Sequence, residues 1–329
     1  MISSLQRRDV ITRMAAAVIF RIGWPIAARA QQPALPVIGF LAVGPNGPKR
    51  WGADFHQGLK EAGYVEGHNV AIEYLGGPPR INRLSELADE LVHQQVAVIL
   101  TSNDGPALAA KLATSTIPIV FFNIGSDPVT LGLVASINRP GANVTGAVFD
   151  SPQLAAKRLD LLCQLVPTAA TVAHLTRSRT LLSFEEHKNV LVETAGALGR
   201  QLITVECRSD NALKQSFESI IERGAGAVIV GPLFTREVAF FAADYKIPAI
   251  YNGRGFVLGG GLMSYGHDFA EQIRLAVGLV GQILNGAKPA DLPIRRSHHF
   301  DFVINLKTAK QLGIEVPQRL LVFANEIIE

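Results

Sequence analysis

Short apolar runs alternate with segments of helical spacing along most of the chain. Runs at residues 37–43, 96–100 and 117–122 are apolar without alternation, which is typical of parallel strands covered on both faces. Between them, segments such as 81–93 repeat apolar residues every three or four positions, which predicts amphipathic helices. Because these units recur in sequence, we expect right-handed crossovers and a doubly wound α/β sheet.

The same alternation restarts after residue 150, so we expect two Rossmann-like lobes. The segments after residue 262 are too short for a third domain and are expected to complete both lobes. The first lobe is predicted to comprise residues 36–147 plus about 263–298, and the second lobe 148–262 plus about 299–329. Several strands would then pass between the lobes and form a hinge over a closing cleft.

Polar residues follow two neighbouring strands in the stretch 96–134, around which the first lobe is organised. The carboxyl ends of parallel strands are where open α/β sheets bind ligands, and free N–H groups of helix starts favour a carboxylate there. A helix is also predicted to begin at Asp127-Pro128. For Asp104 and Asp127 the alternative is that each only caps a helix and does not contact a ligand. The candidate ligand-binding residues of this lobe are Ser102, Asn103, Asp104, Asn123, Ser126 and Asp127.

A second set of candidates lies at the predicted strand ends of the other lobe. Thr176, Pro232, Tyr251 and Asn252 follow strands, and Ser264 with Tyr265 lies at a passage between the lobes. Either tyrosine can stack on an aromatic ligand or pack in the hinge or core, and the sequence leaves both alternatives open.

The charge of the chain is concentrated at its start. The chain has 31 basic and 28 acidic side chains, and residues 1–30 contain five of the basic and one of the acidic ones. The rest of the chain therefore has 26 basic and 27 acidic side chains. The remaining 299 residues are therefore almost neutral, and we expect no nucleic-acid partner. At 329 residues the chain suits two domains.

Residues 1–30 have the features of an export signal. Arg7-Arg8 precedes an Ala-rich apolar run, and Ala28-Arg29-Ala30 has the small-x-small pattern of a signal-peptidase site. We expect export to the periplasm by a twin-arginine or Sec signal, with Gln31 as the mature start. A membrane anchor is the alternative, but Arg21 and Pro25 interrupt the run.

Other motifs that carry chemistry are weak in this sequence. Cys163 and Cys207 are expected to be buried thiols. His298-His299 point to opposite faces of a strand, so no metal site is expected. The glycines of residues 253–261 are expected to form a loop that leads into a strand, which is not the context of a dinucleotide-binding motif. No catalytic residues and no cofactor are predicted.

Several phrases carry a resemblance to a known family, namely GLKEAGYVEGHNVAIEY at 58–74, DPVTLGLVASINRPGANVTG at 127–146, LAAKRLDLL at 154–162 and INLKTAKQLGI at 304–314. In them the chain resembles exported ABC-transporter substrate-binding proteins related to tryptophan and tyrosine binders, with the type I periplasmic binding protein fold. The resemblance implies a monomeric solute receptor, not an enzyme. Such a receptor binds a small organic ligand, such as an aromatic amino acid or related carboxylate, and delivers it to ABC permease membrane subunits.

The chain departs from that family pattern at predicted strand ends that face the cleft. The segment 231–236 is shorter, Asn252 replaces an acidic residue, and 43–48 lacks serines. Ligand choice is therefore expected to depend on the second lobe. The alternatives are an enzyme that uses the same cleft, or the ligand-sensing core of a transcription regulator, which would need a helix-turn-helix at one end.

Overall fold

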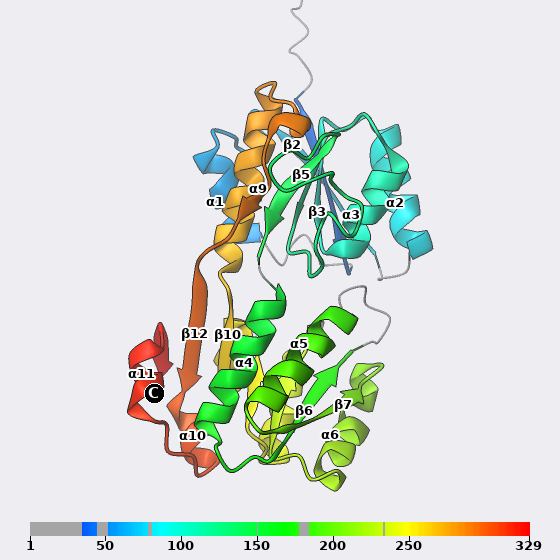
Figure 1. Cartoon of the computed structure of the whole chain (residues 1–329). Helices are drawn as coiled ribbons and strands as arrows, with labels where there is room; N and C mark the ends of the chain where they lie inside the picture. Colours follow the sequence, from blue (N-terminus) through cyan, green and yellow to red (C-terminus); the bar gives the residue numbers. More distant parts are fainter. Residues whose placement is uncertain (1–34, 45–51, 78–80, 150, 178–183, 233) are drawn as a thin grey trace, which may run out of the picture. The chain divides into compact units, whose positions relative to one another are not determined.

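The computed structural model describes residues 35–44, 52–77, 81–149, 151–177, 184–232 and 234–329. The predicted export signal and most of the loop at 43–48 lie outside these residues. The described residues form two mostly parallel sheets with helices on both faces of each (Figure 1).

The first sheet has the strand order β11-β5-β4-β3-β1-β2, and all of its printed pairings are parallel. The order reverses between β1 and β3, which makes the carboxyl ends of these strands the switch point of the lobe. Its elements are β1 (Val37–Val43), α1 (Gly52–Glu61), β2 (Ala71–Gly77), α2 (Ile81–His93), β3 (Val98–Ser102), α3 (Asp104–Ala113), β4 (Ile119–Phe122), β5 (Val144–Val148), α9 (Phe269–Leu284) and β11 (Arg295–Arg296).

The second sheet has the order β13-β12-β10-β9-β8-β6-β7, and β10 with β12 is its antiparallel pair. The same reversal occurs here between β6 and β8. Its elements are α4 (Ser151–Leu165), β6 (Thr171–Thr176), α5 (Phe184–Ala197), β7 (Gln201–Glu206), α6 (Leu213–Glu222), β8 (Ala227–Val230), α7 (Glu237–Asp244), β9 (Ala249–Tyr251), α8 (Arg254–Leu258), β10 (Met263–His267), β12 (Phe300–Asn305), α10 (Leu306–Gln311), α11 (Gln318–Phe323) and β13 (Glu326–Ile328).

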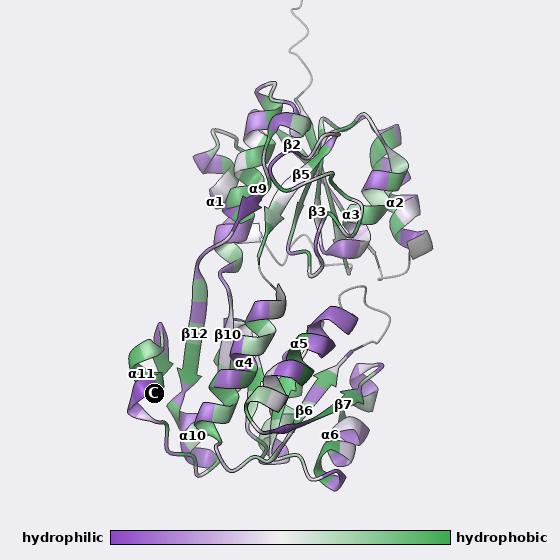
Figure 2. Cartoon of the chain, viewed as in Figure 1, coloured by the Kyte–Doolittle hydropathy of each residue, from purple (hydrophilic) through white to green (hydrophobic). Residues whose placement is uncertain are grey.

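Each sheet is buried between two layers of helices. In the first lobe α1 and α9 cover one face and α2 and α3 the other; in the second, α4 and α5 lie opposite α6 and α7. Every residue of β3, β4, β5 and β8 is buried, whereas the edge strand β7 alternates. Figure 2 shows hydrophilic residues on the helices and hydrophobic ones along the strands. None of the described helices combines the length and apolar character that a membrane crossing requires.

The two-lobed α/β architecture predicted from sequence is confirmed, with two local differences. The expected loop after Gly253 contains α8, because Phe256 and Val257 pack into the core. The sequence pattern predicts the passage into the first lobe at about residue 263, but β10 pairs with β9 and β12 in the second sheet. Cys163 and Cys207 are buried free thiols, as predicted.

The chain passes between the two sheets after β5, after β10 and after β11. The passage after β10 is fixed by Asp268, whose carboxylate accepts hydrogen bonds from the N–H groups of Ala270 (2.8 Å) and Glu271 (3.2 Å) and so caps α9. An N-cap of this kind contributes about 1 kcal/mol, and it sets the point at which α9 begins.

Leu91 lies fully buried between α2 and the first sheet, so Leu91→Ala should lower the unfolding free energy by about 2 to 5 kcal/mol. Leu112→Ala on α3 is the matched control. The Leu112 side chain is 80% exposed, and its loss should change stability by less than about 0.5 kcal/mol. Urea denaturation of both variants measures the difference, and equal effects would contradict the assigned core.

Candidate functional site

The turn after β3 brings two of the predicted residues to the carboxyl edge of the first sheet. Ser102 ends β3 and is buried, and Asn103 has a φ of 75° with a ψ of 163°, which lies outside the left-handed helical region. The Asn103 N–H donates to the carbonyl of Phe122 at the end of β4 (3.1 Å). Residues other than glycine rarely adopt this conformation, so Asn103 holds local backbone strain at the turn into α3.

The Asp104 carboxylate joins this turn to the loop after β4. One oxygen accepts from the Gly125 N–H (2.8 Å), and the other accepts from the Ser126 hydroxyl (2.7 Å). Asp104 and Ser126 are both half-buried. The structure thus brings together Asp104 and Ser126, two residues predicted from different loops, and gives the carboxylate a structural role.

Asn123 is hydrogen-bonded to Gln272 on α9, a residue that the sequence prediction did not include. Its N–H donates to the Gln272 side-chain oxygen (2.9 Å), and Gln272 on α9 is 0% exposed. Among the described residues, nothing accepts a hydrogen bond from Gln272 Nε2. The signal was available in the sequence, because Gln272 interrupts the apolar stripe of α9 at Phe269, Ile273 and Ala276.

Asp127 is exposed and begins a turn, not the helix that the sequence predicted. Its carboxylate accepts from the Thr130 N–H (2.7 Å), and Gly132 then takes a φ of 69°. The helix prediction was wrong because the chain reverses within one turn, where Leu133 N–H bonds to the Pro128 carbonyl (2.9 Å). The capping interaction itself is present in this turn.

In the second lobe, Tyr251 lies inside the core. Its ring stacks on Phe256 at 5.1 Å and 7°, and burial raises the pKa of its hydroxyl. Asn252 follows it, and a side chain at Gly266 would collide with the Asn252 carbonyl, so β10 passes close to this loop. This placement favours the packing alternative for Tyr251.

Ser264 and Tyr265 lie next to each other on β10. Ser264 is fully buried opposite Tyr251 in the sheet register, and its hydroxyl has no partner among the described residues. Tyr265 is half-buried, and its ring lies 6.0 Å from Phe300 and 6.2 Å from Phe302. Their ligand contacts therefore stay predictions.

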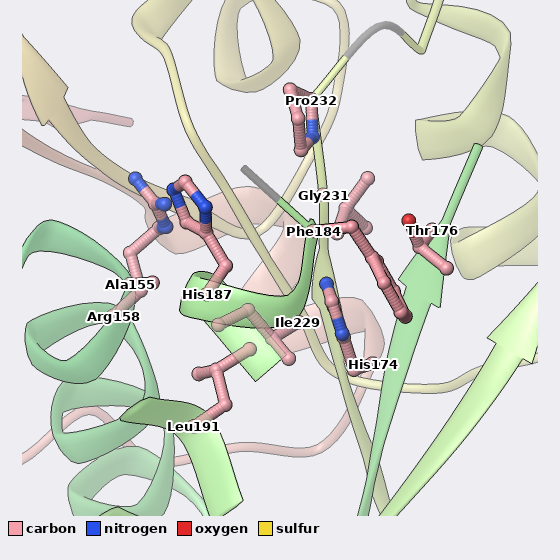
Figure 3. A pocket seen from close by; sticks show the side chains of 11 residues that line it. Ala155, Arg158, His174, Thr176, Phe184, His187, Leu191, Ile229, Gly231 and Pro232 are labelled. Atoms are coloured by element: carbon pink, nitrogen blue, oxygen red, sulfur yellow. The ribbon is translucent and has the colours of Figure 1, made fainter. Parts of the chain in front are cut away.

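A cavity of about 20 Å³ lies at the switch point of the second sheet, where β6 and β8 end. Two predicted residues, Thr176 and Pro232, line it together with groups that the sequence analysis missed (Figure 3). These come from α4, β6 and α5, and include Arg158, His174 and Phe184.

Burial changes the titration of the two basic groups in this cavity. It lowers the pKa of the Arg158 guanidinium to about 10, so that this group remains charged at neutral pH. Burial, with the nearby charges of His187 and Arg158, lowers the pKa of His174 to about 4, so its ring is neutral there. Arg158 could have been found from sequence, because it falls on the apolar stripe of α4 between Ala155 and Leu162.

The passages between the sheets carry a cluster of aromatic rings. The His267 ring stacks on Phe149 (3.8 Å, 18°) and contacts Phe269 (4.1 Å). Burial, followed by the charge of Arg158, lowers the pKa of His267 to about 3. This neutral ring therefore joins the passage after β5 to the passage after β10.

Glu271 forms hydrogen bonds with the passage after β11. Its carboxylate accepts from the Ser297 hydroxyl, from the His299 N–H (3.1 Å) and from His299 Nδ1 (2.7 Å). Burial opposes ionisation, but these hydrogen bonds outweigh it and lower the pKa of Glu271 from 4.5 to about 2. Among the described residues no group of three His, Cys, Asp or Glu side chains can hold a metal ion.

We expect His299 to titrate above its usual value of 6.5, because the bond to Glu271 raises its pKa. The stabilisation from protonated His299 is fully present below pH 6.5 and is lost as pH rises through the pKa of His299 in the folded state. The stabilisation from ionised Glu271 is present above pH 4.5 and is lost as pH falls through its folded-state pKa of about 2. NMR titration should show the His299 value falling in Glu271→Gln, and not in the control Glu222→Gln on α6. An unchanged His299 value in Glu271→Gln would contradict the pairing.

Comparison with known proteins identifies relatives across most of the chain. The profile of the family described as ABC transporter substrate binding protein matches residues 49–328. A tyrosine-binding protein from Clostridioides difficile is 26% identical over 268 residues, which cover 79% of this chain and 76% of that protein.

Two solved structures share the fold along 89% of this chain. A domain from Streptococcus pneumoniae, solved in complex with L-Trp, has a TM-score of 0.79 and 25% identity and is covered over 100% of its length. A conserved domain protein from Vibrio cholerae has a TM-score of 0.79 and 24% identity, and is covered over 99%. The fold is that of type I periplasmic binding proteins, as the resemblance implied.

Proposed function

Because the chain belongs to the ABC transporter substrate-binding protein family, we propose that it is an exported receptor that delivers one small organic solute to the permease subunits of an ABC importer. One observation carries this proposal. Both lobes have the same reversal of strand order, and each presents polar side chains at the carboxyl ends of its strands. A ligand held by both sets would favour the closed state of the hinge, and closure would signal loading to the permease.

The proposed solute is an aromatic amino acid or a related carboxylate. This class is supported by the tyrosine-binding relative and by the L-Trp bound to the Streptococcus protein. We propose that binding involves the predicted residues of both lobes except Tyr251, which packs in the core, with Gln272, Arg158 and His174 added. The lobes would comprise residues 36–147 and 148–262, completed by segments from the last third of the chain.

The proposed protein is a monomer without catalytic activity and without a nucleic-acid partner. The family role is substrate binding, which supports the absence of catalytic activity. The enzyme and regulator alternatives from the sequence gain no separate support from the relatives.

L-Tyrosine, L-tryptophan or an aromatic acid should raise the melting temperature of the purified mature protein. At a ligand concentration of 100 times Kd, linkage adds about 2.7 kcal/mol to the unfolding free energy.

Thr176→Val, at the carboxyl end of β6, should weaken binding about fivefold through the loss of one hydrogen bond. The matched control is Thr171→Val at the opposite end of the same strand, where the hydroxyl donates to Gln201.

Calorimetry of both variants, with D-tryptophan and a hexose as control solutes, measures these effects. If amino acids, aromatic acids and their amides all left the melting temperature of the unmodified protein unchanged, the receptor proposal would fail.

Export should remove residues 1–30 and leave Gln31 as the amino terminus of a periplasmic protein. Cell fractionation with amino-terminal sequencing tests this expectation. The double variant R7K/R8K distinguishes the routes, since a twin-arginine signal loses export and a Sec signal keeps it. Full-length protein retained in the cytoplasm would contradict the proposed location.

A further inference from the structure

The cavity at the end of β6 and β8 contains a buried positive charge. Arg158 on α4 is 8% exposed, and its Nη1 donates to the Tyr265 carbonyl (3.2 Å). In the part of the chain that the structure describes, no carboxylate pairs with Arg158, and its Nε has no hydrogen-bond partner. A buried charge without a counter-ion is strongly unfavourable, so this site calls for an anion.

The other walls of the cavity leave this charge uncompensated. His174 is 4% exposed, its ring lies parallel to Phe184 at 6.5 Å, and its Nδ1 also has no partner among the described residues. Most of the remaining lining is apolar. It also includes His187, which lies beside Arg158, and Thr176, but no aspartate or glutamate (Figure 3). A neutral imidazole such as that of His174 can donate one hydrogen bond to an anion.

The size of the cavity limits what enters it. About 20 Å³ is room for roughly one water-sized group, so a carboxylate oxygen of a solute can enter and a whole amino acid cannot. Gly231 lines the cavity beside His174. A β-carbon there would lie 3.1 Å from the Leu175 carbonyl oxygen and 3.3 Å from His174 Nε2.

We propose that this cavity is a carboxylate subsite, in which Arg158 pairs with the acid group of the solute that the protein carries. The inference rests on the proposed function and deepens it, because it makes the second lobe the part that selects acids over their amides. A guanidinium–carboxylate pair is a strong, charge-assisted interaction, and it is stronger when water is excluded.

The first experiment observes the cavity directly. Formate is added to the isotope-labelled mature protein, and the Arg158 Nε–H signal is followed by NMR, with formamide as the uncharged partner and chloride at equal ionic strength as the anion control. Formate should shift this signal with saturation, and formamide should not. No shift with formate, or equal shifts with formate, formamide and chloride, would overturn the assignment.

The second experiment compares phenylacetate with phenylacetamide by thermal shift and calorimetry. The unmodified protein should bind the acid at least tenfold more tightly than the amide, and Arg158→Met should lose this preference. Arg200→Met is the matched control, because Arg200 in the same lobe also donates to a backbone carbonyl, that of Pro167 (2.7 Å), but does not line the cavity. A preference for the acid that survives in Arg158→Met would overturn the inference.

Two further observations keep the test decisive. If Arg158→Met does not fold, Gly231→Ala retains the charge and narrows the cavity beside His174, and it should reduce phenylacetate binding at least tenfold. Unchanged binding would count against the subsite. The two proposals fail differently. Solutes that stabilise the protein without preference for acids would refute only the subsite, whereas formate binding at Arg158 without binding of any larger solute would support the subsite and refute the receptor.

Discussion

Burial of parallel strands on both faces is the constraint on which the rest of this structure depends. Strands such as β3, β4 and β8 have no solvent-facing side, so the helices must cover both faces of each sheet. Polar side chains can then reach solvent mainly at the ends of the strands. The reversal of strand order separates the neighbouring helices at one point in each lobe, and polar groups from different loops meet at that edge.

Most of the fold could be predicted from sequence because this constraint leaves a local pattern. The uninterrupted apolar run at 37–43 predicts β1 with its observed bounds, and the helical spacing at 81–93 predicts α2 with its observed bounds. The failures have non-local causes. In α8, glycines indicated a loop, but burial of Phe256 and Val257 stabilises a short helix. Strand β11 consists of two exposed arginines that pair with β5 in parallel register, so no hydrophobic signal marks it.

The candidate site was only partly predictable, for a related reason. Topology was enough to select strand-end residues such as Ser102 and Thr176. It did not select Arg158, whose hydrogen-bond acceptor is the carbonyl of Tyr265, 107 positions away. A polar residue on an apolar stripe is informative in both lobes, because Gln272 and Arg158 each interrupt such a stripe and each keep one nitrogen without a partner among the described residues.

The carboxylate of Asp104 has a consequence for how this edge of the first lobe can vary. It bonds to both the backbone at Gly125 and the hydroxyl of Ser126, so the turn after β3 and the loop after β4 share one anchor. An insertion or deletion between residues 123 and 126 would pull both donors out of register with that anchor. The lengths of the two loops are therefore coupled, and divergence among related proteins should change side chains at this edge more readily than the length of either loop alone.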